Sequence, residues 1–519
     1  MSAQVATTTT REAFDVAYAA QPVTSVCRVI FADGETPVSI YRRLADSRPG
    51  TFLLESAGQG GVFTRFSFVG AGSFGVLGER DGEATWAAQG LDAERLLPGG
   101  LAGLAPLDAL SRITARWASE PVAGLPALTS GFVGYVGWEA IRQLEHLPNG
   151  PAAGADLPGQ ALSFVSELVV IDHREGAVVL LANVLGGDTG DTPDADLAWT
   201  DAQLRLDALQ EQLAAPMSMP LSTLDFSVTA EPESLTRQED YLAGVRRAQQ
   251  YIVDGDIFQV VLSQRFDHEC RAEPLDVYRV LRHLNPSPYL YLLSVTGNDG
   301  VPFHVVGSSP EALITVTDDR VYTHPIAGSR PRGATVETDA QHERDLLADE
   351  KERAEHLMLV DLSRNDLLRV CEPDSVEVTE FMRIERFSHI MHIVSSVEGR
   401  LRPGQNAIDA FRATFPAGTL SGAPKPRALQ IIDELEPIQR GVYGGVVGYF
   451  GLGGSADLAI AIRTATIRDG VARVQAGGGI VHESNPLSEF EECRSKAAAP
   501  LRAVAVANTL APLPAGGAR

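Results

Sequence analysis

The sequence predicts an α+β, or mixed α/β, fold. Short segments typical of antiparallel strands dominate the first half of the chain, and longer segments with helical periodicity alternate with strands in the second half. The order of these segments is neither a regular β-α-β alternation nor an all-β pattern, and it contains no internal repeat. We therefore expect two interdependent halves, residues 1–222 and 223–519, with a boundary near Thr223.

The first half contains the clearest hairpin signal. Two apolar segments are separated by Arg174-Glu175-Gly176, which has the composition of a tight turn. The expected elements of this half are strands at 51–55 and 63–69, the two hairpin strands at 166–172 and 177–183, an acidic loop at 186–193, and a short helix closed by residues 215–220.

The second half is expected to begin with a helix. Thr236 followed by Glu239 predicts a capping box, and apolar residues continue at helical spacing from Tyr241 to Ile252 until Gly255 ends the helix. The further elements that we expect are a strand at 257–266, helices at 345–362 and 486–504, and strands at 390–397, 446–450 and 472–475.

The composition narrows the class of protein. The chain has 67 acidic and 43 basic residues, a formal net charge of −24, which repels phosphate backbones and anionic membrane surfaces. Its 4 cysteines are scattered, without the Cys-x-x-Cys pair of a metal or redox site. The N-terminal region lacks the signature of a signal peptide, and no apolar run is long enough to cross a bilayer. We expect a cytoplasmic protein without a nucleic-acid or membrane partner.

Two familiar signatures fail on their context. Residues 70–75 match the glycine pattern of dinucleotide-binding loops, but residues 76–78 predict a strand where pyrophosphate binding needs a helix N-terminus. His389 and His392 have the spacing of a helical metal pair, but they lie in a predicted strand, on which residues three apart face opposite sides. We therefore expect neither a nucleotide site nor a joint histidine site.

Two pairs of glutamates on predicted helices are candidates for a metal site. Each pair has the i, i+3 spacing that places both carboxylates on one helix face, and the pairs are Glu352 with Glu355 and Glu489 with Glu492. One interpretation is a solvated surface with an ion pair between Glu492 and Lys496. The other is that the two helices face each other and hold a hard cation, for which oxygen ligands suit Mg²⁺. The spacing alone leaves both interpretations open.

Segments rich in glycine or proline have the composition of anion-binding loops. Residues 325–333 suit either a rigid loop that presents cations and N–H groups or a tight surface turn. Residues 418–426 precede a predicted helix whose N-terminus suits either an anion or an ordinary cap. Glycines end the strand at 476–480, either for a bulge or because a ligand approaches the backbone closely.

Taken together, these segments resemble the chorismate-utilising enzymes, and most closely the large subunits of anthranilate synthases. The resemblance is specific from about Gln238 to Ala503 and looser before it, chiefly at residues 53–56. Its motifs are Gly307-Ser308-Ser309-Pro310-Glu311, the segment 325–333, Lys351 to Asp361, Met391-His392, Thr419 to Lys425, Tyr443-Gly444-Gly445 and Ala461-Ile462-Arg463-Thr464. It implies a sandwich of largely antiparallel sheets flanked by helices, with a regulatory region at 1–222 and a chorismate-binding region at 223–519.

Two positions distinguish the reactions within this family. Gln259 stands where isochorismate and salicylate synthases carry a lysine that activates water, and a neutral amide cannot be that base. Ala327 stands where aminodeoxychorismate synthases carry a nucleophilic lysine, and a methyl group forms no covalent adduct. The resemblance therefore implies attack of ammonia at ring C2 of chorismate, with anthranilate and pyruvate as products. Ser329 and Gly478 depart from the family's usual threonine and alanine.

The resemblance also assigns site residues. It implies that Mg²⁺ is ligated by Glu355 and Glu492 and that its waters are held by Glu352 and Glu489. The substrate-binding residues that it implies are Gly328, Ser329, Tyr443, Arg463, Gly477, Gly478, Gly479 and Lys496. The catalytic residues that it implies are Gln259, Glu311, His392 and Thr419.

Individual roles follow from the same resemblance. Glu311 would protonate the departing C4 hydroxyl, which needs a carboxyl pKa raised by burial. His392 and Thr419 are both candidates for assisting the second step, in which a proton and pyruvate leave, and the choice of the base between them stays open. Taken alone, His392 would also fit an ordinary half-buried core histidine.

The source of ammonia points to a partner. The chain has no Gly-x-Cys-x-Gly nucleophile of the glutaminase type, so a separate glutamine amidotransferase subunit is implied, in an assembly of two large and two small subunits. Feedback inhibition by L-tryptophan is also implied. The residues of its expected pocket are Leu54, Glu55, Ser56, Asn285, Pro288, Tyr289 and Leu290, where Leu290 replaces a methionine often seen in the family.

Three alternatives stay open at this stage. Pro286 and Pro288 alone would be read as a plain turn. The nearest alternative enzyme is an aminodeoxychorismate synthase, which differs in its aminobenzoate product and in whether pyruvate is released. An alternative of another class is a catalytically silent subunit that binds tryptophan and a partner; Glu311, His392 and the glutamate pairs disfavour it.

Overall fold

The computed structural model describes residues 7–57, 65–154, 157–186, 194–217, 221–386 and 390–513. Its helices are α1 (Arg11–Ala20), α2 (Pro37–Leu44), α3 (Ala93–Leu96), α4 (Pro106–Arg116), α5 (Ala195–Ala214), α6 (Gln238–Val253), α7 (Pro274–Leu284), α8 (Val336–Ala348), α9 (Glu350–Leu368), α10 (Ala407–Thr414), α11 (Lys425–Leu435) and α12 (Pro486–Ala507), with the 3₁₀ turns η2 (Trp138–Gln143), η3 (Pro373–Ser375) and η4 (Gly418–Leu420).

The strands are spread over the whole chain. They are β1 (Val23–Phe31), β2 (Thr51–Glu55), β3 (Phe66–Arg80), β4 (Glu83–Ala88), β5 (Gly131–Val136), β6 (Gln160–Asp172), β7 (Ala177–Leu185), β8 (Ser222–Thr223), β9 (Glu233–Ser234), β10 (Gln259–Glu269), β11 (Tyr289–Thr296), β12 (Pro302–Ser309), β13 (Ala312–Thr317), β14 (Arg320–Thr323), β15 (Ile326–Pro331), β16 (Glu377–Arg386), β17 (Ile390–Arg400), β18 (Gly422–Ala423), β19 (Val446–Gly451), β20 (Ala456–Ile460), β21 (Thr464–Arg468), β22 (Val471–Ile480) and β23 (Ala511–Pro512).

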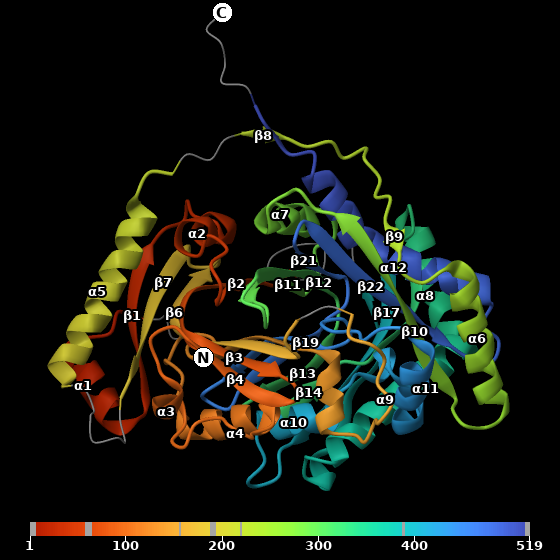
Figure 1. Cartoon of the computed structure of the whole chain (residues 1–519), viewed down its shortest axis with the longest axis horizontal. Helices are drawn as coiled ribbons and strands as arrows, with labels where there is room; N and C mark the ends of the chain where they lie inside the picture. Colours follow the sequence, from red (N-terminus) through yellow and green to blue (C-terminus); the bar gives the residue numbers. More distant parts are fainter. Residues whose placement is uncertain are drawn as a thin grey trace, which may run out of the picture.

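Most of these strands join one large antiparallel sheet that branches into two arms at the paired strands β3 and β6. The first arm runs in the order β3, β2, β11, β12, β21, β22 and β10. The second arm runs in the order β6, β5, β19, β20, β13, β14 and β17, and β15 and β16 also pair with β17. From β6 the sheet also continues through β7 to β1. Helices cover the outside of the sheet, as Figure 1 shows for α5 beside β7 and α12 beside β22. The predicted mixed α/β class is thereby confirmed.

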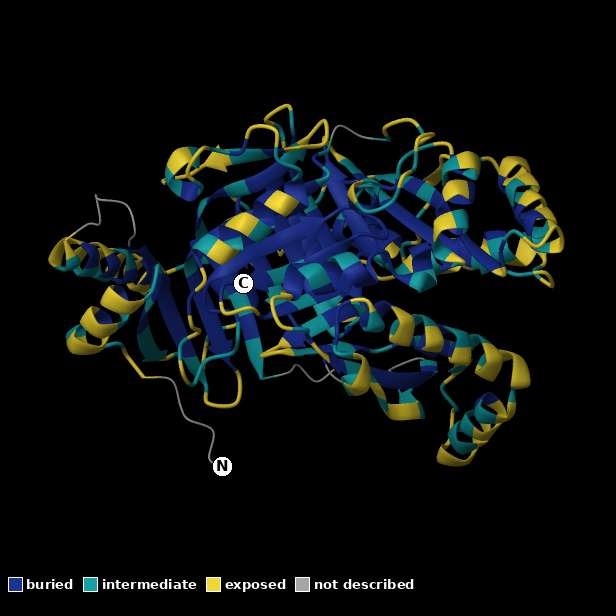
Figure 2. Ribbon diagram, turned by 90° about the horizontal axis from the view of Figure 1, so that it is seen from below, coloured by how far each residue is buried: buried dark blue, intermediate teal, exposed yellow. Residues whose placement is uncertain are grey.

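The two halves of the chain share this sheet. β2 of the first half pairs with β11 of the second, and β5 pairs with β19. At the second junction Phe132 lies opposite Phe450 and stacks on Phe164 at 4.8 Å between ring centroids, and all three rings are buried. Figure 2 shows the strands as the buried interior, while the helices expose one face. The packing across the junction therefore makes each half depend on the other.

Several predicted elements are confirmed in the first half. The strand at 51–55 and the hairpin are present, and the hairpin turn contains Gly176, whose φ of 60° is left-handed. Asp172 stabilises this turn by accepting hydrogen bonds from the backbone N–H groups of Arg174 and Glu175. The strand predicted at 63–69 is present from residue 66 as the start of β3, and residues 63 and 64 lie outside the described residues. β3 continues through residues 70–78, so the dinucleotide-like pattern is in a strand. Residues 187–193 of the predicted acidic loop lie outside the described residues.

Three local predictions are wrong. The helix before residue 215 is not short, because α5 has 20 residues. The capping box is absent: α6 is capped at Arg237, which makes no side-chain capping hydrogen bond. Residues 326–331 form the strand β15 rather than a loop, because they pair with β17, a partner far away in sequence that local composition does not reveal.

The second half otherwise follows the predicted order. The helix expected at 345–362 is two helices, since Asp349 ends α8 and caps α9 by accepting hydrogen bonds from the N–H groups of Lys351 and Glu352. α12 begins at Pro486 after Asn485, which caps it in the same way, and it extends beyond the predicted end. These two capped helices carry the glutamate pairs. Within the described chain, no helix combines the length and the apolar character that a bilayer crossing requires.

Candidate active site

A cavity of about 530 Å³ lies between the far ends of the two arms. β10, β22 and α12 line one side, and β15, β17 and α9 line the other, with η4 between them. Every residue predicted to bind metal or substrate or to act in catalysis lines it, except Gly478. Positions separated by more than 200 residues in the sequence, such as Gln259 and Lys496, are thus brought to one site.

All four predicted metal ligands face this cavity from the two helices. Burial raises the pKa of Glu355, and the negative charges of Glu352 and Glu492 raise it further. Burial likewise raises the pKa of Glu489, with a further contribution from Glu492. The two pairs thus border one cavity, as the metal-site interpretation requires. The ion pair between Glu492 and Lys496, expected from the surface interpretation, is also present, and the Glu492 side chain is 49% exposed.

Three cations lie near these carboxylates. Lys351 of α9 lines the cavity, and its charge opposes the raised pKa of Glu355 and Glu489. Lys496 Nζ is 2.8 Å from Glu492 Oε1 and also donates a hydrogen bond to the Gly477 carbonyl at 3.0 Å. Arg330 of β15 is 2.7 Å from Asp349, and its second nitrogen is 3.6 Å from Glu352. In the described part of the chain, no three His, Cys, Asp or Glu side chains are arranged as a closed metal cluster. The glutamates of the cavity are thus partly balanced by cations on either side.

Glu311 occupies the segment between β12 and β13. Its carboxylate accepts a hydrogen bond from the Thr419 hydroxyl at 3.0 Å. Burial raises the pKa of Glu311 to about 7, against the opposing effects of Thr419 and the Lys496 charge. A carboxyl group of this pKa is partly protonated at neutral pH, so it suits a general acid.

His392 lies on β17 opposite Ser329 of β15. Its Nδ1 is 3.0 Å from the Gly328 carbonyl oxygen. Burial lowers the pKa of His392, an effect opposed by that hydrogen bond and reinforced by the Arg463 charge. The neutral imidazole is therefore favoured, which is the form that accepts a proton. His389 lies outside the described residues.

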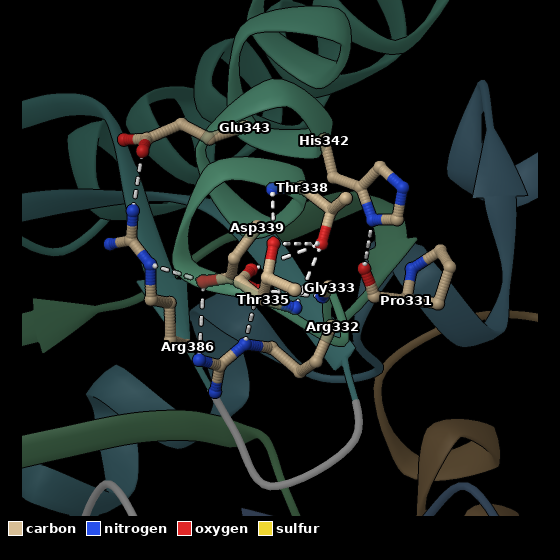
Figure 3. Close-up of polar contacts among 9 residues, drawn as sticks. All are labelled: Pro331, Arg332, Gly333, Thr335, Thr338, Asp339, His342, Glu343 and Arg386. Atoms are coloured by element: carbon tan, nitrogen blue, oxygen red, sulfur yellow. Dashed lines mark hydrogen bonds and ion pairs between the residues drawn. The ribbon is translucent and has the colours of Figure 1, made fainter.

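A polar cluster outside the cavity fixes the end of β15 (Figure 3). Asp339 of α8 pairs with Arg332, just after β15, at 2.8 Å and with Arg386, at the end of β16, at 3.3 Å. Arg386 also pairs with Glu343 of α8. The Arg332 hydrogen bond is the main reason that the pKa of Asp339 is lowered to about 2. This cluster ties α8 to the strands on either side of β17 and so holds the wall that carries His392.

The three glycines of β22 lie close to other groups of the site. They keep a regular antiparallel register with β10, so no bulge is present there. A Cβ on Gly478 would lie 2.7 Å from Glu489 Oε2, and one on Gly479 would lie 2.5 Å from Gln259 Nε2. Gly477 would meet the Tyr443 hydroxyl at 2.9 Å. Side chains of the site itself thus approach this strand closely. The bulge alternative is wrong, and close approach of a ligand stays a prediction.

The remaining predicted residues complete the wall. Tyr443 follows the loop after α11, and Arg463 lies between β20 and β21 with a left-handed φ of 53°. Burial lowers the pKa of Arg463. Gly328 also has a left-handed φ, of 72°, where a Cβ would lie 3.0 Å from Glu352. At two cavity positions, Gly328 and Arg463, the backbone thus adopts a left-handed conformation that strains most side chains.

Sequence reasoning missed a buried ion pair behind the cavity. Arg440 and Glu436 lie 2.6 Å apart, with side chains only 1% and 4% exposed. Arg440 donates to the carbonyls of Leu420, next to Thr419, and Val261, two residues after Gln259. No local signal was available, because i, i+4 spacing indicates a pair only on a helix, and residues 436–440 lie beyond the end of α11. This pair connects two segments that carry predicted catalytic residues.

The residues expected to form the tryptophan pocket also lie together. Glu55 at the end of β2 is opposite Leu290 in β11, and Ala57 donates a hydrogen bond to the Ser287 carbonyl. Glu55 is buried, accepts a hydrogen bond from Tyr278 at 2.6 Å and pairs with Arg282 at 2.9 Å. The structure therefore brings the segments 54–56 and 285–290 side by side, as the pocket would require.

Comparison with known families fits this geometry. The chorismate binding enzyme family matches residues 83–502, which is most of the chain. The chain belongs to this family. The matched region begins well before residue 223, within the half that the resemblance implies to be regulatory.

Relatives of this chorismate-binding enzyme agree over nearly its whole length. Anthranilate synthase component 1 of Arthrobacter globiformis is 50% identical over 93% of this chain and 90% of that protein. The crystal structure of anthranilate synthase component I from Streptococcus pneumoniae is 34% identical, with a TM-score of 0.72 over 91% of this chain and 99% of that one. The menaquinone-specific isochorismate synthase of Escherichia coli, at 18% identity and a TM-score of 0.68 over 93% and 95%, shares the fold.

Proposed function

We propose that this chain is the large subunit of an anthranilate synthase, which converts chorismate and ammonia to anthranilate and pyruvate in tryptophan biosynthesis. The observation that carries the proposal is one cavity that combines Glu311, the glutamate pairs of α9 and α12, and the neutral side chains Gln259 and Ala327. The relatives named anthranilate synthase component 1 support it, since they match more than nine-tenths of the chain.

Mg²⁺ is the proposed cofactor. The donor set fits, because four carboxylates border one cavity and the pKa values of Glu355 and Glu489 are raised by neighbouring negative charge as well as by burial. Glu355 and Glu492 would ligate the ion, and Glu352 and Glu489 would hold its waters. When bound, the cation supplies positive charge that attracts the ring carboxylate of dianionic chorismate into an acidic cavity.

The first chemical step is addition of ammonia at C2 with loss of the C4 hydroxyl. Glu311 donates the proton to the departing hydroxyl, consistent with a pKa raised to about 7. Gln259 is a neutral amide and supplies no base, so water is not activated as a nucleophile instead of ammonia. Arg463, Tyr443 and the backbone of residues 477–479 bind the enolpyruvyl side, and Lys496 with the Gly328-Ser329 segment closes the site.

The second step removes the C2 proton and pyruvate to leave an aromatic ring. His392 and Thr419 are the proposed assisting groups. The neutral imidazole of His392 favours it as the base, whereas Thr419 already donates its hydroxyl hydrogen to Glu311. His392→Gln should therefore slow this step more than Thr419→Val.

A partner and a regulator complete the proposal. A glutamine amidotransferase subunit would supply ammonia, in a heterotetramer of two large and two small subunits in the cytoplasm. L-tryptophan would bind at residues 54–56 and 285–290, where Leu290 is buried and Asn285 lies within 3.5 Å of Ser287. If added tryptophan changed neither turnover nor the unfolding temperature, the regulatory part of the proposal would fail.

The deciding experiment mixes the purified chain with chorismate, Mg²⁺ and ammonium at alkaline pH and identifies products by fluorescence and mass. Anthranilate with an equal amount of pyruvate is the expected result. Aminodeoxychorismate or isochorismate would show that Ala327 and Gln259 do not set the reaction. If product formed only after a glutamine amidotransferase subunit was added, the reaction would stand and the chain would depend on its partner.

A further inference from the structure

A second cavity, of about 600 Å³, lies next to the active-site cavity. Its walls come from η2 and β6 in the first half of the chain and from β10, β22 and residues 439–443 in the second. Tyr443 and Gln475 line both cavities, so one layer of side chains separates them. The proposed reaction assigns no role to this second cavity.

Two polar side chains of the second cavity have unsatisfied hydrogen-bonding groups. Gln160 is 1% exposed, and neither its amide oxygen nor its amide nitrogen has a partner among the residues that the structure describes. Within the same described ranges, Nε and Nη1 of Arg473 are buried without a hydrogen-bond partner. Buried polar groups are nearly always paired with protein, water or ligand. Since both side chains line the cavity, a partner for them belongs there.

The charges around the second cavity single out Arg473. The other arginines that line it each have a close carboxylate partner: Arg142 with Asp433 at 2.8 Å, Arg265 with Asp267 at 2.9 Å and Arg440 with Glu436 at 2.6 Å. Arg473 shares Asp267 with Arg265, and its contact of 3.8 Å is the longer of the two, whereas Arg265 donates a hydrogen bond to each Asp267 oxygen. The positive charge of Arg473 is therefore poorly balanced.

Acidic groups at the same cavity limit what could bind there. The Glu79 carboxylate is held by the backbone N–H groups of Gly82 and Gly159. Asp81 and Glu139 also line the cavity, and burial raises the pKa of Glu139 to about 7. These carboxyl groups would repel a multiply charged anion such as phosphate. A small anion with one charge and two oxygen acceptors matches a guanidinium group and an amide better.

We propose that the second cavity binds a small carboxylate anion through Arg473 and Gln160. Pyruvate, the three-carbon acid released in the proposed reaction, is the first candidate, because Tyr443 of the shared wall is assigned to the enolpyruvyl side of the substrate. The carboxylate class follows from the cavity itself, whereas the choice of pyruvate rests on the proposed function. The cavity then receives an acid that leaves the active site past Tyr443 and Gln475.

The test is calorimetric titration of pyruvate into the full chain and into two variants. Gln160→Met keeps the length of the side chain and removes only the amide, and Arg473→Met removes only the charged end. Each should weaken pyruvate binding at least about tenfold. Because the Gln160 amide has no partner in the described chain, Gln160→Met should not lower the unfolding temperature of the ligand-free protein.

Gln143→Met is the matched control. Gln143 lines the same cavity, but its amide oxygen accepts a hydrogen bond from the Leu107 N–H group. This variant should lower the unfolding temperature and leave pyruvate binding unchanged. Wild-type protein that binds no pyruvate up to about 10 mM, or a cavity that holds water only, would overturn the proposal. So would binding that survives Arg473→Met but is lost in Arg463→Met, since that places the anion in the active site.

A parallel titration with acetate separates two sources of the anion. Tighter binding of pyruvate than of acetate would assign the site to the product, and equal binding would assign it to small carboxylates from solution. Neither titration needs turnover. The product assay can therefore refute the proposed reaction while the titrations still determine whether the second cavity binds a carboxylate.

Discussion

Buried carboxylates occur in two regions of this molecule with opposite surroundings. Where β2 meets α7, Glu55 is balanced by Arg282 at 2.9 Å and by the Tyr278 hydroxyl at 2.6 Å. In the active-site cavity, Glu311 accepts from a neutral hydroxyl, and Glu355 faces other glutamates. The first region uses its carboxylate to hold elements together, whereas the second keeps charge available for a proton, a cation or a substrate.

Glu355→Gln is the largest expected disturbance of the second region. The variant loses a proposed metal ligand, so turnover should fall on the order of 10³-fold or more. Its unfolding temperature should stay the same or rise, because repulsion from Glu352 and Glu492 is relieved. Initial anthranilate fluorescence and thermal unfolding measure the two effects. Glu350→Gln, an exposed position on the same helix, is the control and should change neither; more than a tenth of the wild-type rate in Glu355→Gln would contradict the assignment.

Glu55→Gln tests the first region and should have the opposite profile. Removing the charge leaves Arg282 without its buried carboxylate, at a cost of about 2–3 kcal/mol in the free energy of unfolding. Urea denaturation at fixed pH measures this loss. The exposed pair of Glu175 with Arg174 supplies the comparison, since Glu175→Gln should have little effect. Equal stabilities of the two variants would mean that Glu55 is not a structural carboxylate.

Glu311→Gln tests the active-site carboxylate through turnover and through the pH dependence of stability. Its turnover should fall on the order of 10²–10³-fold, because the amide cannot donate the required proton. In the folded state the pKa of Glu311 is raised from 4.5 to about 7, so the folded protein holds this proton more tightly than the unfolded chain does. The resulting contribution to the free energy of unfolding is fully present below pH 4.5 and is lost as pH rises through about 7. Glutamine does not ionise, so the variant should gain about 1–3 kcal/mol over wild type across this window. Thermal unfolding of both proteins from pH 4 to pH 9 measures the difference, and a constant difference would show that Glu311 has an ordinary pKa.

Ser329→Thr should have the smallest effect. Position 329 pairs with His392 directly after an irregularity in the β15–β17 ladder between Ala327 and Ser329. It lies in a strand, where a β-branched side chain fits, and the hydroxyl is kept. We expect kcat/KM within about threefold of wild type. Ser329→Ala removes the hydroxyl and should lower kcat/KM more. If alanine matched serine, the hydroxyl would have no part in substrate binding.

The sequence predicted local elements better than long-range pairing. The hairpin around Gly176 and the helix that begins at Pro486 have signals within a few residues, and both are present. The single helix expected at 345–362 is instead divided at Asp349. Residues 325–333 looked like a loop because four of these nine residues are proline or glycine, and only pairing with β17 makes residues 326–331 a strand. The site residues were predicted from the family resemblance, because no local pattern indicates that Gln259 lies near Glu311.

Some features of the site had no signal that a single sequence could give. The glycines at 477–479 suggested a close approach, but the approaching groups, Glu489, Gln259 and Tyr443, were not identifiable before folding. The unsatisfied amide of Gln160 is likewise a property of packing alone. Such features depend on which elements meet in space, which spacing along the chain does not determine.

The shared sheet has a consequence for synthesis of the chain. β2 and β5 are made early, yet their partners β11 and β19 lie up to about 310 residues further along, as for Val136 and Val446. A nascent first half therefore emerges from the ribosome with two sheet edges open, which are templates for pairing with other chains. Because β19 comes late in the chain, folding is completed only near the end of translation, and a fragment that stops at residue 222 should aggregate rather than fold.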